Sequence, residues 1–281
     1  YHIGVLEALE ENGVPIDYVA GTSMGSIIAA MYAAGYSPAE MRAIVDSGVV
    51  KEWVSGRIDP NKYMAYYRQV GSNPAFLSLR IDVESPSGKR LRVPRNLISS
   101  TQIDMALTEL FAPATAAADG DFDRLMVPFL CVASDLNHRG PVVMREGDLS
   151  EAVRSSMSIP LVFKPMVKDS MLLYDGGIYD NFPWKPLDET FRPDYLIGSK
   201  CTSGNTEPNA KSIMDQVWML TMEKTDYDMP AGRSTLIERA VDVSMLDFSQ
   251  ADAIIQSGYD DTMALMDSLK SAVPRRMSRG E

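Results

Sequence analysis

Short apolar runs alternate along the chain with amphipathic segments of helix length. The apolar runs of strand length lie at 16–20, 128–135, 141–146, 171–177, 193–200 and 240–247. Apolar residues at helical spacing predict helices at 2–13, 24–35, 37–48, 101–112, 148–158, 212–226 and 249–270. Residues 76–93 alternate apolar and polar positions on either side of a Ser-Pro-Ser-Gly turn, which predicts a hairpin. Because strands and helices alternate, the pattern predicts an α/β fold, layered around a mostly parallel sheet.

Glycine, serine and proline mark the predicted ends of these helices. Gly13 and Gly35 are expected just past the first two helices, because glycine readily adopts the left-handed conformation that ends a helix. Ser37 is expected as the N-cap of the third helix, with Pro38 at its first position. The fourth helix is expected to end before Pro113, because proline interrupts helical hydrogen bonding.

Composition and charge exclude several classes of function. No apolar run approaches the roughly 20 residues that a membrane-spanning helix needs. The chain carries 27 Lys and Arg residues against 38 Asp and Glu residues, a net charge of -11. This charge argues against nucleic acid as a partner, because a polyanion would be repelled on average. Cys131 and Cys201 adjoin apolar runs, which predicts buried free thiols rather than a disulfide or a metal site.

The organisation of the chain indicates one domain over residues 1–281. The printed sequence opens inside an amphipathic helix, which indicates that residues upstream of Tyr1 are missing. The polar, basic segment 274–281 has two interpretations, the start of a linker or a frayed terminus.

A candidate nucleophile lies in the stretch "GTSMG". Ser23 has the Gly-X-Ser-X-Gly spacing of a nucleophile elbow and lies between a predicted strand and a predicted helix, where that turn belongs. Gly21 and Gly25 supply the small neighbours that a strained turn needs. The following helix places its positive end beside Ser23, where it would stabilise a developing oxyanion. The alternative is a glycine-flanked turn in which Ser23 is only a helix N-cap.

A nucleophilic serine needs a base, and the chain has only two histidines. His2 precedes Ser23 on a short helix, and no histidine follows His138. In the chain order of α/β-hydrolases the histidine comes last, after the serine and the acid. A Ser-His-Asp triad is therefore disfavoured.

Asp175 is the best-placed carboxylate. It ends an apolar strand, and Gly176 and Gly177 allow close approach of the backbone. One alternative is an ordinary Asp-Gly turn. Another is a metal site with Asp180 and Asn181, which is weaker because no recognised ligand spacing accompanies these residues.

Taken together, these motifs resemble the patatin-like phospholipase family. "GTSMG" is similar to the nucleophile motif of that family and implies that role for Ser23, and "DGG" is similar to its second motif and implies the role of base for Asp175. Residues 154–165 resemble the segment between the two motifs, and 180–183 resemble the family's residues just after the aspartate. The resemblance implies a three-layer α/β sandwich with a Ser-Asp dyad in place of a triad.

The resemblance also implies a glycine-rich oxyanion loop just before the "HIGVL" helix, and the printed sequence does not contain it. A chain that begins at Tyr1 is therefore expected to hydrolyse esters very slowly. The residues expected to support the elbow and the oxyanion are Gly21, Met24, Gly25, Gly176 and Gly177.

The activity implied by the family is serine-dependent hydrolysis of fatty-acid esters, without a metal or organic cofactor. The expected partners are phospholipids or other lipid esters and a membrane surface, and the resemblance favours the bacterial cell envelope or secretion over the cytoplasm. Met24, Met157, Met166 and Met171 are interpreted as core filler, with the lining of an acyl channel as the alternative. Two other functions stay open, a triad-type esterase and a non-catalytic lipid-binding domain.

Overall fold

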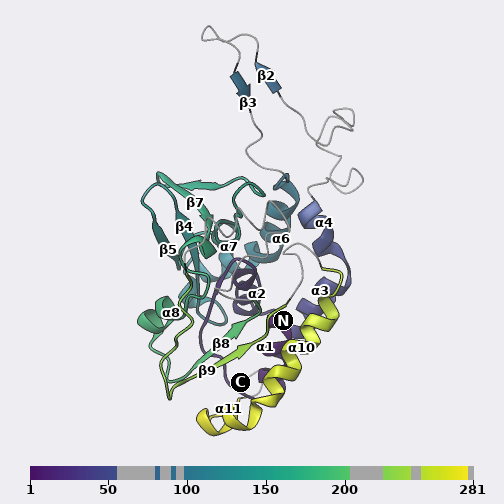
Figure 1. Cartoon of the computed structure of the whole chain (residues 1–281), viewed down its shortest axis with the longest axis vertical. Coiled ribbons are helices and arrows are strands. Elements are labelled where there is room, and N and C mark those ends of the chain that lie inside the picture. The colour runs from purple at the N-terminus through teal and green to yellow at the C-terminus, as the bar shows by residue number, and fades with distance from the viewer. Residues whose placement is uncertain (56–79, 83–89, 93–97, 203–223, 242–247, 278–281) are drawn as a thin grey trace.

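The computed structural model describes residues 1–55, 80–82, 90–92, 98–202, 224–241 and 248–277 (Figure 1). Its main sheet contains β1 (Val19–Thr22), β4 (Phe129–Asp135), β5 (Gly140–Met144), β6 (Met166–Lys168) and β7 (Met171–Asp175). Two further strands, β8 (Leu196–Lys200) and β9 (Ser234–Glu238), form a separate pair. The described α-helices are α1 (His2–Glu11), α2 (Met24–Ala33), α3 (Pro38–Asp46), α4 (Val49–Ser55), α6 (Thr101–Ala118), α7 (Leu149–Ser156), α8 (Trp184–Phe191), α10 (Ala251–Ala264) and α11 (Met266–Ala272).

Strand β4 is the centre of the main sheet, and all of its residues are buried. Cys131 and Val132 pair with both β1 and β5, whereas 133–135 pair with both β5 and β7. Because a strand has two edges, β5 occupies one edge of β4, and β1 and β7 share the other. Strand β1 is parallel to β4 and β7 is antiparallel to it, so β1 and β7 run toward each other along this edge.

The sheet is mixed rather than mostly parallel. The pair β1–β4 is parallel, but β4–β5, β4–β7 and β6–β7 are antiparallel. Short connections explain two of these antiparallel pairs, β4–β5 and β6–β7, because a short turn can join only antiparallel strands. Asp169 and Ser170 alone join β6 to β7, and both have left-handed backbones, with φ of 46° and 65°, as type I′ hairpin turns require.

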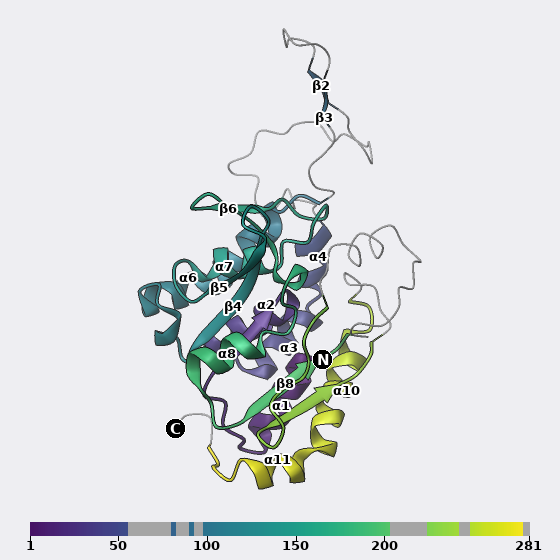
Figure 2. The ribbon, with the colours of Figure 1, turned by 60° about the vertical axis from the view of Figure 1, so that its left-hand side comes forward.

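Helices cover both faces of this sheet (Figure 2). On one face, Cys131 and Ala133 of β4 share a core with apolar residues of α2, α6 and α7. On the other face, Tyr18 stacks on Phe191 of α8 with ring centroids 4.6 Å apart. Tyr18 directly precedes Val19, whose side chain lies in the first core. Because neighbouring residues along a strand point to opposite faces of the sheet, Tyr18 and the helix it packs against lie on the second face. The α/β class and the three layers are therefore confirmed.

A second core lies between the parallel pair β8–β9 and the helices α1, α10 and α11. Helices α1 and α10 cross with their backbones in contact (Figure 1). A Cβ atom on Gly4 would lie 1.9 Å from the Ile255 carbonyl oxygen, and one on Gly258 would lie 2.2 Å from that of Tyr1. Only glycine permits so close a crossing at these two positions.

The predicted ends of the first helices are confirmed. Gly13 and Gly35 follow α1 and α2 with φ of 63° and 99°. Ser37 caps α3 in a capping box, in which its hydroxyl accepts from the Glu40 N–H at 3.2 Å and the Glu40 carboxylate accepts from the Ser37 N–H at 2.7 Å. Pro38 occupies the first turn, as expected.

The prediction that a helix ends before Pro113 is wrong, because α6 continues to Ala118 with Pro113 inside it. Proline removes one helical hydrogen bond, but four of the five residues after it are alanine, the strongest helix former. The helix ends instead at Asp119, which adopts the left-handed conformation with φ of 56°.

Other predictions along the second half of the chain are confirmed only in part. The helix predicted at 249–270 is two helices, α10 and α11, which meet at Leu265. The helix predicted at 212–226 and the strand predicted at 240–247 lie mainly outside the described residues. The hairpin prediction at 76–93 agrees with the antiparallel pair β2 (Arg80–Asp82) and β3 (Arg90–Arg92), and its turn also lies outside the described residues. The sequence patterns missed α4, β6, α8 and β9.

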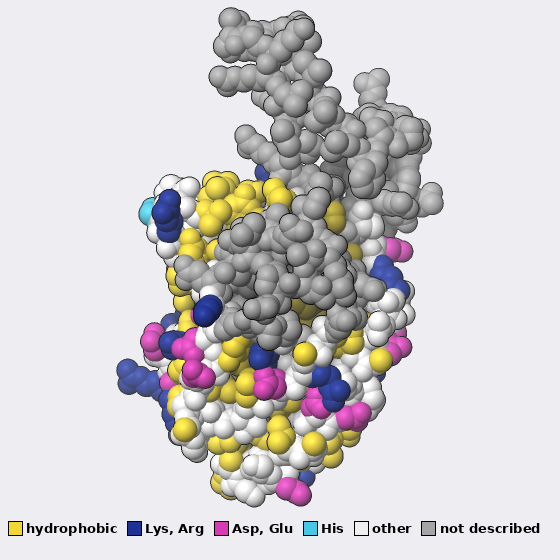
Figure 3. Space-filling model, viewed as in Figure 1, with side chains coloured by type: hydrophobic (Ala, Val, Ile, Leu, Met, Phe, Trp, Pro, Cys, Tyr) yellow, Lys and Arg dark blue, Asp and Glu magenta, His cyan; other side chains and the backbone are white. Residues whose placement is uncertain are grey.

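Two surface properties bear on function. No helix in the described part of the chain is both long and apolar enough to span a membrane. Acidic and basic side chains are interspersed on the lower part of the face in Figure 3 rather than gathered by sign.

Both cysteines are free thiols, as expected. Cys131 is fully buried, whereas Cys201 is only half-buried.

Candidate active site

The carboxyl ends of β1 and β7 meet on the edge of β4. Thr22, the last residue of β1, pairs with Val132, and Asp175, the last residue of β7, pairs with the next residue, Ala133. The chain therefore delivers Ser23 and Asp175 to the same point from opposite directions. The Ser23 hydroxyl donates a hydrogen bond to Asp175 Oδ2 at 2.6 Å, across 152 residues of sequence. The predicted contact between the two residues is confirmed.

Ser23 has a backbone conformation that suits a strained turn. Its φ is 54° and its ψ is -124°, a combination that non-glycine residues rarely adopt. Its side chain makes no capping hydrogen bond to α2, so the interpretation of Ser23 as a simple N-cap is wrong. The strain instead points its hydroxyl at Asp175.

Of the two glycines in this motif, only Gly21 is required by packing. A Cβ atom on Gly21 would lie 2.3 Å from the Gly25 carbonyl oxygen, a backbone atom that cannot move aside without shifting α2. A Cβ atom on Gly25 would meet nothing within 4 Å among the described residues. The expectation that Gly25 must be small to fit the turn is therefore not supported by its surroundings.

We expect Gly21→Ala to destabilise the fold by about 1–3 kcal/mol, because the added methyl group overlaps backbone atoms of the elbow. Gly25→Ala is the matched control, since its methyl group enters open space and alanine favours a helix. Urea unfolding of the two variants and the parent would measure the difference. Equal stability of Gly21→Ala and the parent would contradict the packing argument.

Asp175 is completely buried, with a relative exposure of 0%. Its Oδ1 accepts from the Gly177 N–H at 2.8 Å, and its own N–H donates to the Ser158 carbonyl at 2.9 Å. Burial raises the pKa of Asp175 to about 7, and the hydrogen bonds from Ser23 and Gly177 oppose that rise only in part. A carboxyl with this pKa exchanges a proton near neutral pH.

The glycines after Asp175 have separate roles. A Cβ atom on Gly176 would lie 2.1 Å from the Val132 carbonyl oxygen, so only glycine lets the chain turn against β4 here. Gly177 supplies the N–H that holds Asp175. The expected close approach of the backbone is therefore confirmed at Gly176.

Asp180, considered above as a metal ligand, is bound into the local backbone. Its Oδ1 accepts from the Phe182 N–H at 3.1 Å, and its carbonyl oxygen accepts from the Thr22 hydroxyl at 2.9 Å. Burial raises its pKa. Among the described residues, no group of three or more His, Cys, Asp and Glu side chains lies close enough to hold a metal ion.

The first turn of α2 presents hydrogen-bond donors beside Ser23. The N–H groups of Met24 and Gly25 have no acceptor among the described residues, and they lie at the positive end of the helix. Met24 is 37% exposed, so the core-filler interpretation is wrong for this residue. The other methionines near the motifs, Met157, Met166 and Met171, pack in or against the main core, as the core-filler interpretation predicts.

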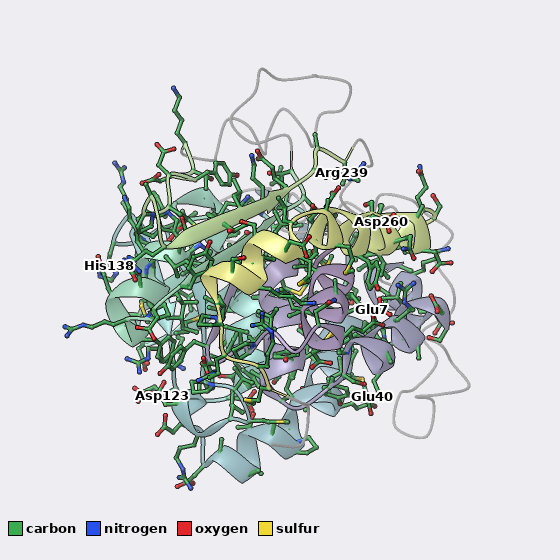
Figure 4. The ribbon with its side chains drawn as sticks, turned by 90° about the horizontal axis from the view of Figure 1, so that it is seen from below. Glu7, Glu40, Asp123, His138, Arg239 and Asp260 are labelled. Atoms are coloured by element: carbon green, nitrogen blue, oxygen red, sulfur yellow. The ribbon has the colours of Figure 1, made fainter. Side chains whose placement is uncertain are left out.

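Neither histidine contacts the candidate site. His2 is half-buried, with Nδ1 2.7 Å from the Ser199 hydroxyl, and desolvation lowers its pKa to about 3. His138 pairs with Asp135 in the turn after β4 and lies at the edge of the ribbon in Figure 4. Within the described residues, the side chain that accepts the Ser23 hydroxyl is Asp175. The histidines therefore do not form a triad with Ser23 in this structure.

The sequence motifs missed one residue that touches Ser23. The hydroxyl of Ser156, the last residue of α7, accepts from the Ser23 N–H at 3.1 Å. Ser156 lies inside the segment 154–165 that resembled a known family, but no periodicity or motif distinguished it from the serines beside it. Its contact depends on how α7 packs against β4.

Comparisons with known proteins identify relatives of this chain. A sequence model described as Patatin-like phospholipase matches residues 1–188. An uncharacterized NTE family protein of Mycobacterium bovis is 27% identical over 240 residues, which cover 84% of this chain and 56% of that protein. Lysophospholipase NTE1 of Cryptococcus neoformans is 28% identical over 210 residues, which cover 74% of this chain and 11% of that protein. The chain thus spans about half the length of the mycobacterial relative and a smaller part of the fungal one.

Among solved structures, VipD from Legionella pneumophila aligns with 95% of this chain and 64% of its own, with a TM-score of 0.46 and 14% sequence identity.

Proposed function

The chain belongs to the patatin-like phospholipase family, and on this premise we propose that it is a serine lipid acyl hydrolase of the phospholipase A or lysophospholipase type. The observation that carries the proposal is the 2.6 Å hydrogen bond from the Ser23 hydroxyl to the buried carboxylate of Asp175. The name of the fungal relative, a lysophospholipase, supports lipid esters as the substrate class.

The proposed reaction is acyl transfer through a covalent intermediate. Asp175 takes the proton of the Ser23 hydroxyl while Ser23 Oγ forms a bond to the ester carbonyl carbon. The tetrahedral intermediate then breaks its bond to the alcohol oxygen, and Asp175 returns the proton to that oxygen. In the second half, Asp175 takes a proton from water, whose oxygen attacks the acyl-enzyme. Collapse of that intermediate releases the fatty acid, and the proton returns to Ser23.

Burial makes Asp175 a better base than an ordinary carboxylate. A solvated aspartate has a pKa of about 3.9 and would hold a serine proton poorly. The pKa of about 7 that burial gives Asp175 brings its proton affinity near the working pH, where general-base catalysis is most effective.

The developing negative charge needs donors as well as a base. The N–H groups of Met24 and Gly25 stand at the N-terminus of α2, beside Ser23 and without acceptors among the described residues. Such donors, held in place before the reaction, stabilise an oxyanion without reorganisation. We assign them a share of the oxyanion site.

We expect the rate of ester hydrolysis to rise with pH through about 7, because Asp175 acts as a base only when it is deprotonated. Below that pH, kcat/KM should fall about tenfold per pH unit. A pH–rate profile with a soluble ester measures this. A rate that increases toward acid would contradict the role of Asp175.

The same pKa has the opposite consequence for stability. Because the pKa of Asp175 in the folded state is raised above its unfolded value of about 3.9, the folded protein binds this proton more tightly. The contribution to stability is therefore fully present below about pH 4 and is lost as the pH rises through about 7. As the pH rises toward about 7, the rate of hydrolysis therefore increases while this contribution to stability decreases.

A fluorophosphonate probe and a phospholipid substrate together test the proposed function. The probe should label the parent protein at Ser23, and Ser23→Ala should remain unlabelled. Phosphatidylcholine vesicles and lysophosphatidylcholine micelles should release free fatty acid with the parent protein. A protein that binds such vesicles but is neither labelled nor active would be a non-catalytic lipid-binding domain.

A further inference from the structure

Ser156 holds the backbone of the candidate nucleophile. Its hydroxyl accepts from the Ser23 N–H at 3.1 Å and donates to the Val132 carbonyl oxygen at 2.6 Å. Ser156 is completely buried, with a relative exposure of 0%. Because water does not reach this hydroxyl, both of its hydrogen bonds are made within the protein.

The Val132 carbonyl marks the junction between β1 and β7 on the edge of β4. Val132 pairs with Thr22, and the next residue of β4 pairs with Asp175. Gly176 packs directly against the same carbonyl, where a Cβ atom would approach to 2.1 Å. Ser156 therefore connects the first residue after β1 to the point where the two strands meet.

Ser158, two residues past the end of α7, holds the other half of the pair. The Ser158 carbonyl accepts from the Asp175 N–H at 2.9 Å. The Ser158 hydroxyl accepts from Arg154 Nη1 at 2.6 Å, and Arg154 is itself bound to Asp104 at 2.5 Å. Residues 156–158 thus contact both Ser23 and Asp175 from one short segment.

We propose that Ser156 is a positioning residue for the reaction assigned to Ser23 and Asp175, an inference that rests on the proposed function. It stabilises the left-handed backbone of Ser23, so that the hydroxyl of Ser23 faces Asp175. It also occupies the N–H of Ser23, whereas the N–H groups of the next two residues, Met24 and Gly25, have no acceptor in the described part of the chain.

Ser155 is a matched control within the same helix. It is also buried, and its hydroxyl donates to the Glu151 carbonyl at 2.7 Å, a contact internal to α7. It makes no hydrogen bond to Ser23 or Asp175. Ser155→Ala therefore removes a buried hydroxyl from α7 without removing a contact to the pair.

The experiment compares Ser156→Ala, Ser156→Cys and Ser155→Ala with the parent protein. We expect both Ser156 variants to lower kcat on the order of tenfold to a hundredfold, because a small misplacement of a nucleophile is enough for such a loss. KM should stay within about twofold, since substrate contacts are unchanged. The midpoint of the pH–rate profile should stay at the parent value, because the surroundings of Asp175 are intact. Ser155→Ala should retain the parent kcat.

Thermal unfolding of each variant separates positioning from folding. The cysteine variant keeps a side chain of similar shape while weakening its hydrogen bonds. If Ser156→Ala does not fold, the kcat of Ser156→Cys tests whether Ser156 positions Ser23. Parent-like kcat in the folded Ser156 variants would overturn the inference, as would an equal loss in Ser155→Ala or a shifted pH midpoint. A parent protein without esterase activity, or activity that survives in Ser23→Ala, would overturn the proposed function and this inference with it. Activity that needs Ser23 but not Ser156 would overturn this inference alone.

Discussion

Ser23→Ala should reduce ester hydrolysis by on the order of 10⁴- to 10⁶-fold, because no acyl-enzyme can form without the Oγ nucleophile. The fold should be retained. The side chain is small, it does not cap α2, and its hydroxyl bonds to Asp175, which keeps the bond from Gly177. Steady-state rates with a soluble ester and labelling by a fluorophosphonate would measure the loss.

Ser271→Ala on α11 is a suitable control for this experiment. Its hydroxyl donates to the Asp267 carbonyl within the helix, and the substitution should leave the rate unchanged. If Ser23→Ala retained more than about a tenth of the parent rate, a different group would have to be the nucleophile.

Asp175→Asn should lower kcat/KM by on the order of 10²- to 10⁴-fold, the contribution typical of a positioned general base. The amide has the shape of the carboxyl, so the strand and the turn should persist. Above about pH 7 the variant should be at least as stable as the parent, because it removes a buried negative charge. Urea unfolding at about pH 8 together with the rate assay would test both statements.

Asp169→Asn provides the control, since Asp169 is exposed in a hairpin turn whose left-handed backbone asparagine also favours. The double variant Ser23→Ala/Asp175→Asn should be no slower than Ser23→Ala alone, because the two residues act as one unit. Additive losses would indicate that they work independently and would contradict the dyad.

Much of the local structure could be predicted from the sequence, because its causes are local. A capping serine and a proline define the start of α3, and glycines end α1 and α2. Ser23 and Asp175 were identifiable for the same reason, since each follows an apolar strand and has glycines beside it. Pro113 shows the limit of such rules, because an alanine-rich continuation outweighs one missing hydrogen bond.

The strand pairing could not be predicted in this way. Nothing in residues 171–175 indicates that β7 would run antiparallel to β4 and end where β1 ends. That arrangement depends on long-range pairing, and it is what brings Ser23 to Asp175. Ser156 was invisible for the same reason, because its sequence neighbours include other serines and only its packing against β4 distinguishes it.

The glycine crossing of α1 and α10 has a consequence for how the protein unfolds. Helix α1 is the element before β1, and one of the surfaces that cover it, α10, comes from residues far beyond 188, where the family match ends. Gly4 and Gly258 bring the two backbones so close that α10 cannot detach without exposing α1. The unit that opens cooperatively, as hydrogen exchange would detect it, is therefore larger than the segment that defines the family. Loss of α10 would expose α1 and thereby loosen the amino-terminal end of β1, the strand that precedes the nucleophile. This would happen although α10 contributes no side chain to the site.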